Sequence, residues 1–424
     1  MSNKIIQISK ISKLNLSSLS SGHKLGVIKY LDTSNITKNS ISNLQIFRAK
    51  IEKIPSRAKR RVKKNTIVYS TVRPNQEHYG FLEHPDENLI VSTGFTTIDV
   101  IDESIDSKFI YYLVTQKQIT NYLHNIGINA TSSYPSIRPE DIGNLKFKVP
   151  EKIQDQEKIA SVISSLDSKI ELNSKINSEL EQMAKTLYDY WFVQFDFLDK
   201  NGRPYKTSGG KMVWNEDLKR EIPEGWECFE LSKVISRVAT GLNPRENFKL
   251  GRGSNYYVTI ANIDNGRVFL DDKCDTIDDE ALKIIDHRSD LQVGDILFTS
   301  IEPVGLTYLI QEKPKNWNIN ESVFTIRPNY ELATAEYVYM LLSSDEIKAF
   351  TKNVSAGSIH KGVRIGVLNS FKTTYSNKEL ISKFSKIIEP MLKQINTLEK
   401  ENQSLSELRD WLLPMLMNGQ VKVK

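Results

Sequence analysis

The side chains with the most obvious binding chemistry are six basic residues between positions 57 and 64, with no acidic residue among them. They are Arg57, Lys59, Arg60, Arg61, Lys63 and Lys64. They lead into an apolar stretch that is followed by the polar set Ser70, Thr71, Arg73 and Asn75. Cationic groups bind phosphates, and a mixture of guanidinium, amide and hydroxyl groups can read base edges. The pattern predicts a nucleic-acid contact, although a charged face that meets only water stays open as an alternative.

No catalytic or metal-binding pattern accompanies these residues. We find no GxxxxGK[ST] loop, no GxGxxG after a predicted strand and no nucleophile elbow. The two cysteines, Cys228 and Cys274, and the six scattered histidines lack metal-ligand spacing. The net charge of +5 is only mildly basic, so the argument for a polyanion rests on local clustering. We expect a protein without a metal site that is not an enzyme by itself.

Compartment signals are weak but consistent. The N-terminal residues lack the apolar core of a signal peptide, and no apolar run reaches the length of a membrane span. The low cysteine content suits a reducing compartment. The expectation is a cytoplasmic protein with no membrane partner.

The chain repeats itself over more than half its length. Tyr30–Ile36 resembles Tyr257–Ile263 at an offset of 227 residues, and Thr66–Pro74 resembles Asp295–Pro303 at an offset of 229. The apolar series that begins at Ile159 returns at Phe384, 225 residues later. A period this long is too great for a solenoid and indicates a duplicated domain followed by a helix. We therefore expect two similar but unequal binding domains.

Two polar loops, at residues 130–138 and 355–364, occupy equivalent places in the repeat yet share almost no sequence. Divergent loops on a repeated scaffold predict two different sequence readings, although ordinary loop drift would leave the same pattern. These loops and other polar positions of the repeat give the remaining predicted DNA contacts: Thr33, Ser34, Ser132, Ser133, Tyr134, Ser136, Arg245, Ser300, Ser358, His360, Lys361 and Arg364.

β-Branched and aromatic runs predict strands at Val27–Leu31, Ile67–Ser70 and Leu89–Val91, and a closing strand that ends at Pro150. Helical spacing extends from Phe109 to Leu123.

Two stretches predict long helices at about 154–194 and 378–417, each with a heptad pattern. The first contains no helix breaker, whereas Pro390 in the second predicts a kink. In the first, the pattern predicts a three-residue slip at Asn173, after which Ile176 and Met183 continue the apolar stripe. Asn173 and Asn402 would either fix the register of the helices or face solvent. Since neither helix can bury its stripe alone, we expect the two to pack as an antiparallel coiled coil.

The predicted fold is therefore α/β, with two mixed α/β domains that alternate with two long helices in a pseudo-twofold internal repeat. The expected segments are a first domain at 1–150, a first helix at 151–197, a connector at 198–221, a second domain at 222–377, and a second helix with the tail at 378–424.

Four segments carry a resemblance to a known family: Gln156–Ala160 with Leu187–Phe192, Ile222–Trp226, Gly294–Phe298, and the tail Leu408–Val421. In this order they make the chain resemble the specificity subunit of type I restriction–modification systems over nearly its whole length. The first domain departs from the family pattern because it lacks an opening of the Pro-Glu-Gly-Trp type.

The resemblance implies a non-catalytic subunit whose two target-recognition domains bind a bipartite, asymmetric site in double-stranded DNA. It also implies two modification subunits, which bring S-adenosylmethionine and methylate adenine, and two restriction subunits, which use ATP and Mg for translocation and cleavage. The chain itself would hold no cofactor. The helical regions would dock the modification subunits, with expected contacts at Leu187, Tyr190, Trp191, Phe192, Leu408, Trp411 and Leu412.

Two other functions remain to be distinguished. A stand-alone DNA methyltransferase or fused restriction enzyme would need a cofactor pocket, and the isolated chain would bind S-adenosylmethionine. A purely structural coiled-coil scaffold would show no sequence-selective DNA binding.

Overall fold

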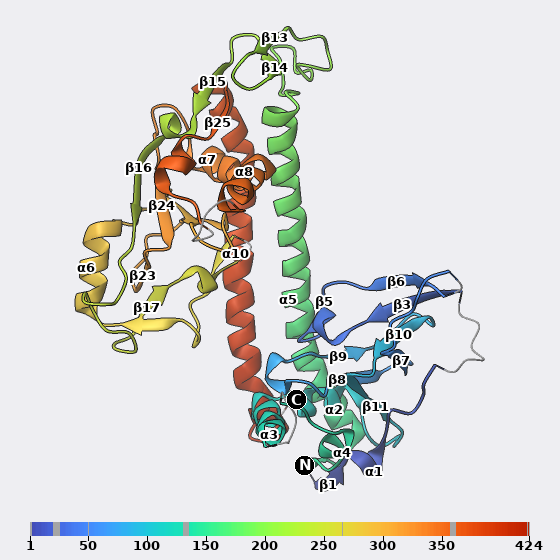
Figure 1. The fold of residues 1–424 in the computed structure, drawn as a ribbon. Helices are drawn as coiled ribbons and strands as arrows, with labels where there is room; N and C mark the ends of the chain where they lie inside the picture. The colour runs from blue at the N-terminus through green and yellow to red at the C-terminus, as the bar shows by residue number, and fades with distance from the viewer. Residues whose placement is uncertain are drawn as a thin grey trace. The chain divides into compact units, whose positions relative to one another are not determined.

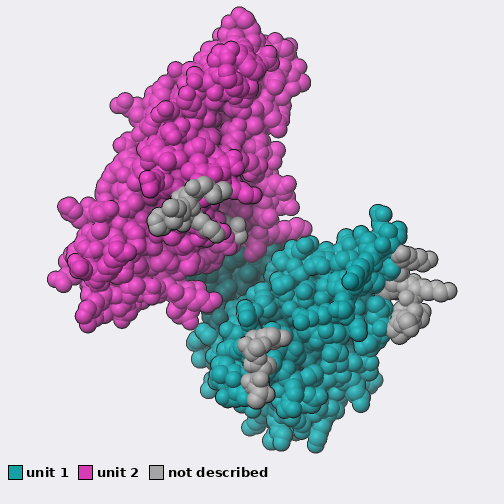
Figure 2. Space-filling view, viewed as in Figure 1, with its two compact units in different colours: residues 1–172, 401–424 teal, residues 173–400 magenta. Residues whose placement is uncertain are grey.

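The structure is a computed structural model that describes residues 2–19, 26–49, 51–129, 135–264, 266–356, 362–421 and 423. The chain forms two compact units (Figure 2). Unit 1 combines residues 1–172 with residues 401–424, and unit 2 comprises residues 173–400. Each unit therefore contains one α/β domain and a segment of each long helix.

Unit 1 is built on two four-stranded sheets, with strand orders β6-β3-β10-β7 and β2-β11-β8-β9. The strands of these sheets are β2 (Ser12–Leu14), β3 (Val27–Leu31), β6 (Gln45–Arg48), β7 (Ala58–Arg61), β8 (Thr66–Ser70), β9 (Tyr79–Leu82), β10 (Leu89–Ser92) and β11 (Phe95–Val100). A separate antiparallel pair joins β1 (Asn3–Gln7) to β12 (Lys146–Pro150). The four predicted strands of this domain are thus confirmed.

Short elements complete unit 1: α1 (Ile8–Ile11), α2 (Ser107–Val114), α3 (Lys117–Ile128), α4 (Pro139–Gly143), β4 (Ile36–Thr37), β5 (Ser40–Ile41) and 3-10 turns at Thr33–Asn35 and Pro74–Gln76. The helical stretch predicted from Phe109 to Leu123 is divided between α2 and α3. The backbone leaves helical geometry there, with ψ of 3° at Thr115 and 141° at Gln116.

Unit 2 repeats most of this topology, although its second sheet, β20-β17-β23, has three strands and no counterpart of β7 among the described residues. Its sheet β16-β24-β21-β22 has the order of β2-β11-β8-β9 in unit 1, and the parallel pair β17–β23 matches the parallel pair β3–β10. The strands are β15 (Glu227–Glu230), β16 (Ile235–Thr240), β17 (Asn255–Val258), β18 (Ile263–Asp264), β19 (Arg267–Val268), β20 (Asp275–Ile277), β21 (Ile296–Thr299), β22 (Thr307–Leu309), β23 (Trp317–Ile319), β24 (Val323–Pro328) and β25 (Lys372–Tyr375). The duplication inferred from the sequence is therefore present in the strand order.

The helices of the second domain are α6 (Asp279–Ser289), α7 (Ala335–Leu342), α8 (Asp345–Ala356) and α9 (Ile365–Asn369). The segment expected to be a plain connector carries a hairpin, in which β13 (Met212–Asn215) pairs with β14 (Arg220–Pro223).

Two long helices, α5 (Ile153–Tyr188) and α10 (Lys378–Met417), dominate the ribbon (Figure 1). α5 continues into a π-helical turn at Asp189–Val193. Within unit 1, Lys169 of α5 forms an ion pair with Glu401 of α10, and Asp167 with Arg409. Within unit 2, Asn177 bonds to Ile395, and the ring of Tyr188 packs on Phe384. As the residue number increases along α5, the number of the residue that it contacts on α10 decreases. The two helices are therefore antiparallel in both units.

The heptad pattern of α5 continues without a slip through Asn173, and the predicted irregularity is wrong. Asn173 and Asn177 are both 0% exposed, whereas Ile176 and Met183 are 37% and 50% exposed. The inward-facing positions are the half-buried Ile170 and Leu180 and the buried Asn173, Asn177 and Ala184, which follow one another with alternating steps of three and four. The pattern of apolar residues gave the wrong prediction because Asn173 and Asn177, which are polar, occupy buried positions. Asn173 does not face solvent.

Each core is completed by the ends of both long helices. In unit 1, Ile159 and Ile163 of α5 lie in one hydrophobic cluster with Leu416 and Met417 of α10. In unit 2, Phe384 and Ile388 of α10 lie in one cluster with Trp191 and Phe192. Leu416 and Met417 follow Trp191 and Phe192 by 225 residues, which is the offset of the helical repeat. In the described part of the chain, no helix is long and apolar enough to cross a membrane.

Candidate nucleic-acid interface

In unit 1, the turn between β10 and β11 brings the predicted contacts together. The Thr93 amide donates to the Arg57 carbonyl at 2.8 Å. Both the amide and the hydroxyl of Thr71 donate to the Gly94 carbonyl, at 2.8 and 2.9 Å. Residues from the basic run and from the segment after β8 are therefore held on the two sides of one turn.

The loop that ends at Ser136 joins the same cluster. The Arg73 amide donates to the Pro135 carbonyl at 2.8 Å, and the Ile137 amide donates to the Thr71 carbonyl at 2.9 Å. Val72 and Ser136 form an isolated antiparallel bridge between these contacts. Two segments that the sequence suggested separately thus lie side by side.

A third segment, after β3, closes the cluster. A Cβ atom added to Gly94 would lie 2.9 Å from the Cγ2 atom of Thr33, so a larger residue here would require the Thr33 side chain to shift. The Asp32 carboxylate accepts from the Thr33 amide at 2.8 Å and fixes the start of the turn that carries Thr33 and Ser34. Burial raises the pKa of the nearby Tyr30 hydroxyl, so it remains a neutral hydrogen-bonding group.

The basic run is part of strand β7 rather than a free loop. Arg57 and Lys59 are exposed, as are Arg73 and Asn75 beyond β8. Arg60 is half-buried and its Nε donates to the Phe95 carbonyl at 2.9 Å. Burial also lowers the pKa of Arg60, which marks its partial removal from water. Arg61 is half-buried as well. The exposed side chains of Arg57 and Lys59 are therefore available for contacts with a ligand. The half-buried Arg60 instead supports the strand through its hydrogen bond to Phe95.

Unit 2 builds an equivalent cluster from equivalent elements. The amide and hydroxyl of Ser300 both donate to the Ser322 carbonyl, at 2.9 and 2.8 Å, as Thr71 does to Gly94 in unit 1. The Val363 amide donates to the Ser300 carbonyl at 2.8 Å, and Ile301 bridges Gly362. The repeated scaffold thus reproduces the same loop pairing.

Arg245 lies exposed on a loop that starts beside this cluster. The Gly241 amide donates to the Asn320 carbonyl at 3.1 Å, and the Tyr257 hydroxyl donates to the Leu242 carbonyl at 2.6 Å. A Cβ atom on Gly241 would meet the Ile319 carbonyl at 1.7 Å, so the loop can leave the sheet here only with glycine. Arg364 is also exposed, directly after the Gly362 bridge.

Two predicted contacts take other roles. Ser70 and Ser300 are buried, and their hydroxyls donate to the backbone carbonyls of Val72 and Ser322. They shape the turns and do not reach the surface, because Ser70 ends the fully buried strand β8 and Ser300 directly follows the fully buried strand β21. Six predicted contacts lie outside the described residues: Ser132, Ser133, Tyr134, Ser358, His360 and Lys361.

Sequence reasoning missed the turn that organises each cluster. Ser92, Thr93 and Gly94 in unit 1, and Asn320 and Ser322 in unit 2, look like ordinary turn residues in the sequence. Their position became evident only from the strand pairing. Arg138 was not among the predicted contacts, although it is the last residue of the predicted loop at 130–138 and is exposed.

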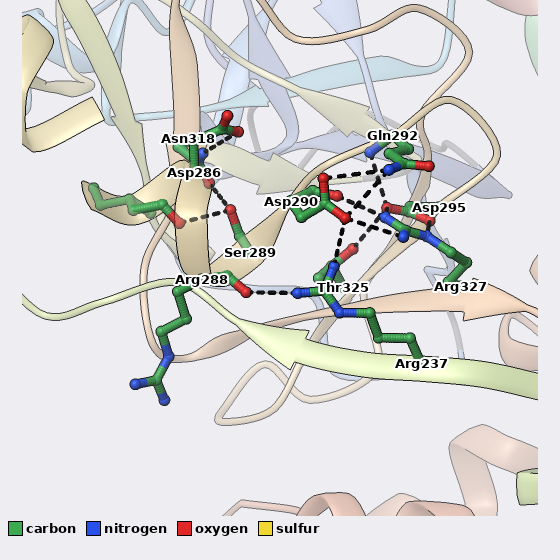
Figure 3. Close-up of polar contacts among 11 residues, drawn as sticks. Arg237, Asp286, Arg288, Ser289, Asp290, Gln292, Asp295, Asn318, Thr325 and Arg327 are labelled. Carbon is green, nitrogen blue, oxygen red and sulfur yellow. Dashed lines mark hydrogen bonds and ion pairs between the residues drawn. The ribbon is translucent and has the colours of Figure 1, made fainter. Parts of the chain in front are cut away.

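An ion-pair network holds the strands that carry the unit 2 cluster (Figure 3). Arg327 on β24 donates to both carboxylate oxygens of Asp295, at 2.8 and 2.9 Å, and to Asp290 at 3.1 Å. Arg237 on β16 donates to Asp290 at 2.8 Å. Burial alone would raise the pKa of Asp290, but hydrogen bonds from Gln292 and Arg327 lower it overall. Asp295 immediately precedes β21, so the network anchors the end of β21 that is opposite Ser300.

The predicted docking residues divide into buried and accessible groups. Trp191 and Phe192 are only 5% and 3% exposed and lie in the core of unit 2, so they cannot form a docking surface in this fold. Leu187, Tyr190 and Leu412 are half-buried. Leu408 and Trp411 are 42% and 56% exposed. Among the described residues, no group of three potential ligands could hold a metal ion.

Comparison with known proteins identifies the family. A family model described as "Type I restriction modification DNA specificity domain" matches residues 4–182. The HindI type I restriction enzyme specificity subunit of Haemophilus influenzae is 25% identical, over 93% of this chain and 94% of its own. The MjaIX specificity subunit of Methanocaldococcus jannaschii is also 25% identical, over 85% of this chain and 78% of its own.

The fold is also known from experiment. The crystal structure of a type I restriction–modification S subunit from M. genitalium matches with a TM-score of 0.56 at 16% identity, and the match covers 98% of this chain and 96% of the other.

The duplicated α/β domains and the paired long helices agree with the fold of that S subunit. Residues 4–182 match the type I restriction modification DNA specificity domain, and over most of its length the chain is similar to the specificity subunits of type I restriction–modification systems. Such a subunit recognises DNA sequence for the system's modification and restriction subunits and is not itself catalytic.

Proposed function

We propose that each unit reads one half of a bipartite, asymmetric DNA site through its loop cluster. The main support for this proposal is the repeated backbone arrangement. In unit 1 the amide and hydroxyl of Thr71 both donate to the Gly94 carbonyl, and in unit 2 those of Ser300 both donate to the Ser322 carbonyl. The side chains on this common scaffold differ between the units. A similar framework with different side chains is suited to two unequal half-sites.

The roles follow from exposure. Arg57 and Lys59, exposed beside the turn of unit 1, are suited to phosphates, which occur in every sequence. Arg73 and Asn75 combine a guanidinium and an amide, which discriminate base edges in the major groove. Thr33, Ser34 and Ser136 supply hydroxyls around them. In unit 2, Arg245 and Arg364 are the exposed cations of the cluster.

We propose the expected segments as functional modules, with residues 1–150 and 222–377 as the two target-recognition domains. The assembled system would contain two modification subunits with S-adenosylmethionine and two restriction subunits with ATP and Mg, acting on chromosomal DNA in the cytoplasm. Leu408 and Trp411 offer accessible apolar surface for a modification subunit, and half-buried Leu187, Tyr190 and Leu412 adjoin the helix ends.

Selection from randomised duplexes tests this function. The full chain, assembled with its modification subunits, is incubated with a random DNA pool, and the bound DNA is sequenced. The expected result is one consensus with two unlike parts separated by unread base pairs. A single continuous consensus, or no enrichment, would count against a two-part reading.

A further inference from the structure

Each loop cluster has an exposed arginine at the same place in the repeat. Arg138 in unit 1 and Arg364 in unit 2 each immediately precede a short helix, α4 or α9, and each follows the loop residue that pairs with the other segment. Both are exposed, and they are 226 residues apart. The scaffold therefore presents the same cation at the same place in both units.

One neighbouring position differs in charge. Arg73 directly follows Val72, the residue that bridges Ser136, and Glu302 directly follows Ile301, the residue that bridges Gly362. Both side chains are exposed, and a proline comes next in each loop. The backbones differ in detail, since Arg73 has a φ of 47° and the Glu302–Pro303 peptide bond is cis. The same place in the cluster thus carries a guanidinium in unit 1 and a carboxylate in unit 2.

DNA presents both an invariant and a variable surface to such a scaffold. Phosphates are the same in any half-site, so a group that contacts them can stay the same in both units. Bases differ between half-sites, so a group that reads them must differ. By this reasoning Arg138 and Arg364 are suited to phosphates, whereas Arg73 and Glu302 are placed to read bases.

The two charges match opposite base chemistries. A guanidinium donates to the O6 and N7 acceptors of guanine, whereas a carboxylate accepts from the N4 amino group of cytosine. An exposed carboxylate also repels the polyanion at every sequence, and a base that offers a donor offsets part of that repulsion. Glu302 would therefore select by rejection of other bases as well as by attraction to cytosine.

We propose that Glu302 is a specificity-determining residue that accepts a hydrogen bond from a cytosine amino group in the half-site read by unit 2. Arg73 occupies the corresponding place against guanine in the other half-site. This inference rests on the proposed function and adds the identity of one base in each half-site.

The test uses Glu302→Gln in the full chain assembled with its modification subunits. The variant keeps the shape of the side chain but replaces the carboxylate with an amide, which pairs with adenine through N6 and N7. Sequencing of DNA selected from a random pool should show preference moving from cytosine to adenine at one position of one half-site. The preference for cytosine over other bases at that position should fall roughly 10- to 100-fold. Binding to unselected DNA should become tighter.

Glu331→Gln is the matched control, because Glu331 is exposed and lies beyond the end of β24 that is opposite Ser322. It removes the same charge and should leave the consensus unchanged. Glu302→Ala provides a second variant, which should lose preference at the same position without gaining adenine.

An unchanged consensus for both Glu302 variants would overturn the inference while the two-part reading stands. A change spread over both half-sites would overturn it too. If the unaltered complex selects no consensus, the proposed function itself fails, and the two failures are thereby distinguished.

Discussion

Arg57 occupies a place where a cation can contact DNA without reading its sequence. It is exposed, its carbonyl is fixed by Thr93, and no carboxylate of the described residues forms an ion pair with it. We predict that Arg57→Ala weakens binding of the assembled complex to all sequences by a similar factor. The slope of log binding constant against log salt should shrink by about 0.9, the value for one phosphate contact.

Binding is measured over a range of salt concentrations with a target duplex and a scrambled duplex. Lys200→Ala removes an equal charge from an exposed position in the connector and is the control. An Arg57 variant with the wild-type salt slope would show that this part of the basic run meets only water.

Asp290 gives the fold a defined response to acid. Its folded pKa is lowered overall, since hydrogen bonds from Gln292 and Arg327 outweigh its burial. A group with a lowered folded pKa stabilises the fold above its unfolded pKa, and this contribution is lost as pH falls through the folded pKa. We predict that Asp290→Asn is less stable than the wild type near neutral pH and equally stable in strong acid. Unfolding free energies across the acid range check this; a constant difference would contradict it.

At the scale of elements, regular periodicity carried most of the predictable fold. Runs of β-branched residues predicted strands β3, β8 and β10, and a heptad pattern predicted the long helix α10. Both patterns involve residues that are close together in the sequence. The buried asparagines of α5 could not be predicted in the same way. Ile176 and Met183 supply an apolar pattern that competes with Asn173, and only packing against α10 decides which face is buried.

The loop clusters show a similar division. The sequence indicated the segment after β8 and the loop before the closing strand as polar candidates. It did not reveal the β10–β11 turn between them, because that turn enters the cluster through strand register, which depends on residues far apart in the chain.

The Arg327 network should dominate the stability of the sheet that carries the unit 2 cluster. Arg327→Leu would leave Asp295, which is 1% exposed, without its ion-pair partner. We predict a loss of about 3–5 kcal/mol in the free energy of unfolding of that domain. Arg237→Leu is the control, because its partner Asp290 is 48% exposed and keeps Arg327. That change should cost below about 1 kcal/mol, as for other partly exposed ion pairs. Equal losses in denaturant titrations would refute the asymmetry.

Asn177 places an amide inside the helix pair at a cost in stability. Its Nδ2 donates to the Ile395 carbonyl at 3.4 Å, whereas its buried Oδ1 has no hydrogen-bond partner among the described residues. We predict that Asn177→Leu raises the free energy of unfolding by about 1–2 kcal/mol, since it removes an unsatisfied buried acceptor. Met183→Leu, at an exposed position of the same helix, should have little effect. Destabilisation by Asn177→Leu would mean that the amide stabilises the pair.

For the whole molecule, duplication gives two α/β domains that share the strand order of one four-stranded sheet and one parallel strand pair, while their exposed side chains differ. Each domain is completed by segments of both long helices, so the units share their helices while keeping separate loop clusters. Such a molecule can change one half of its target without a new fold. The account's central claim is therefore that the two halves of the DNA site are read independently.

Exchange of residues 222–377 for the second domain of a related specificity subunit tests that claim most directly. The chimera is assembled with the modification subunits, and its methylated sites are mapped across a bacterial genome. We predict that one half of the methylated sequence changes to the donor's half while the other half stays as in the unaltered chain. A folded, active chimera in which both halves change together, or in which neither changes, would contradict independent reading by the two units.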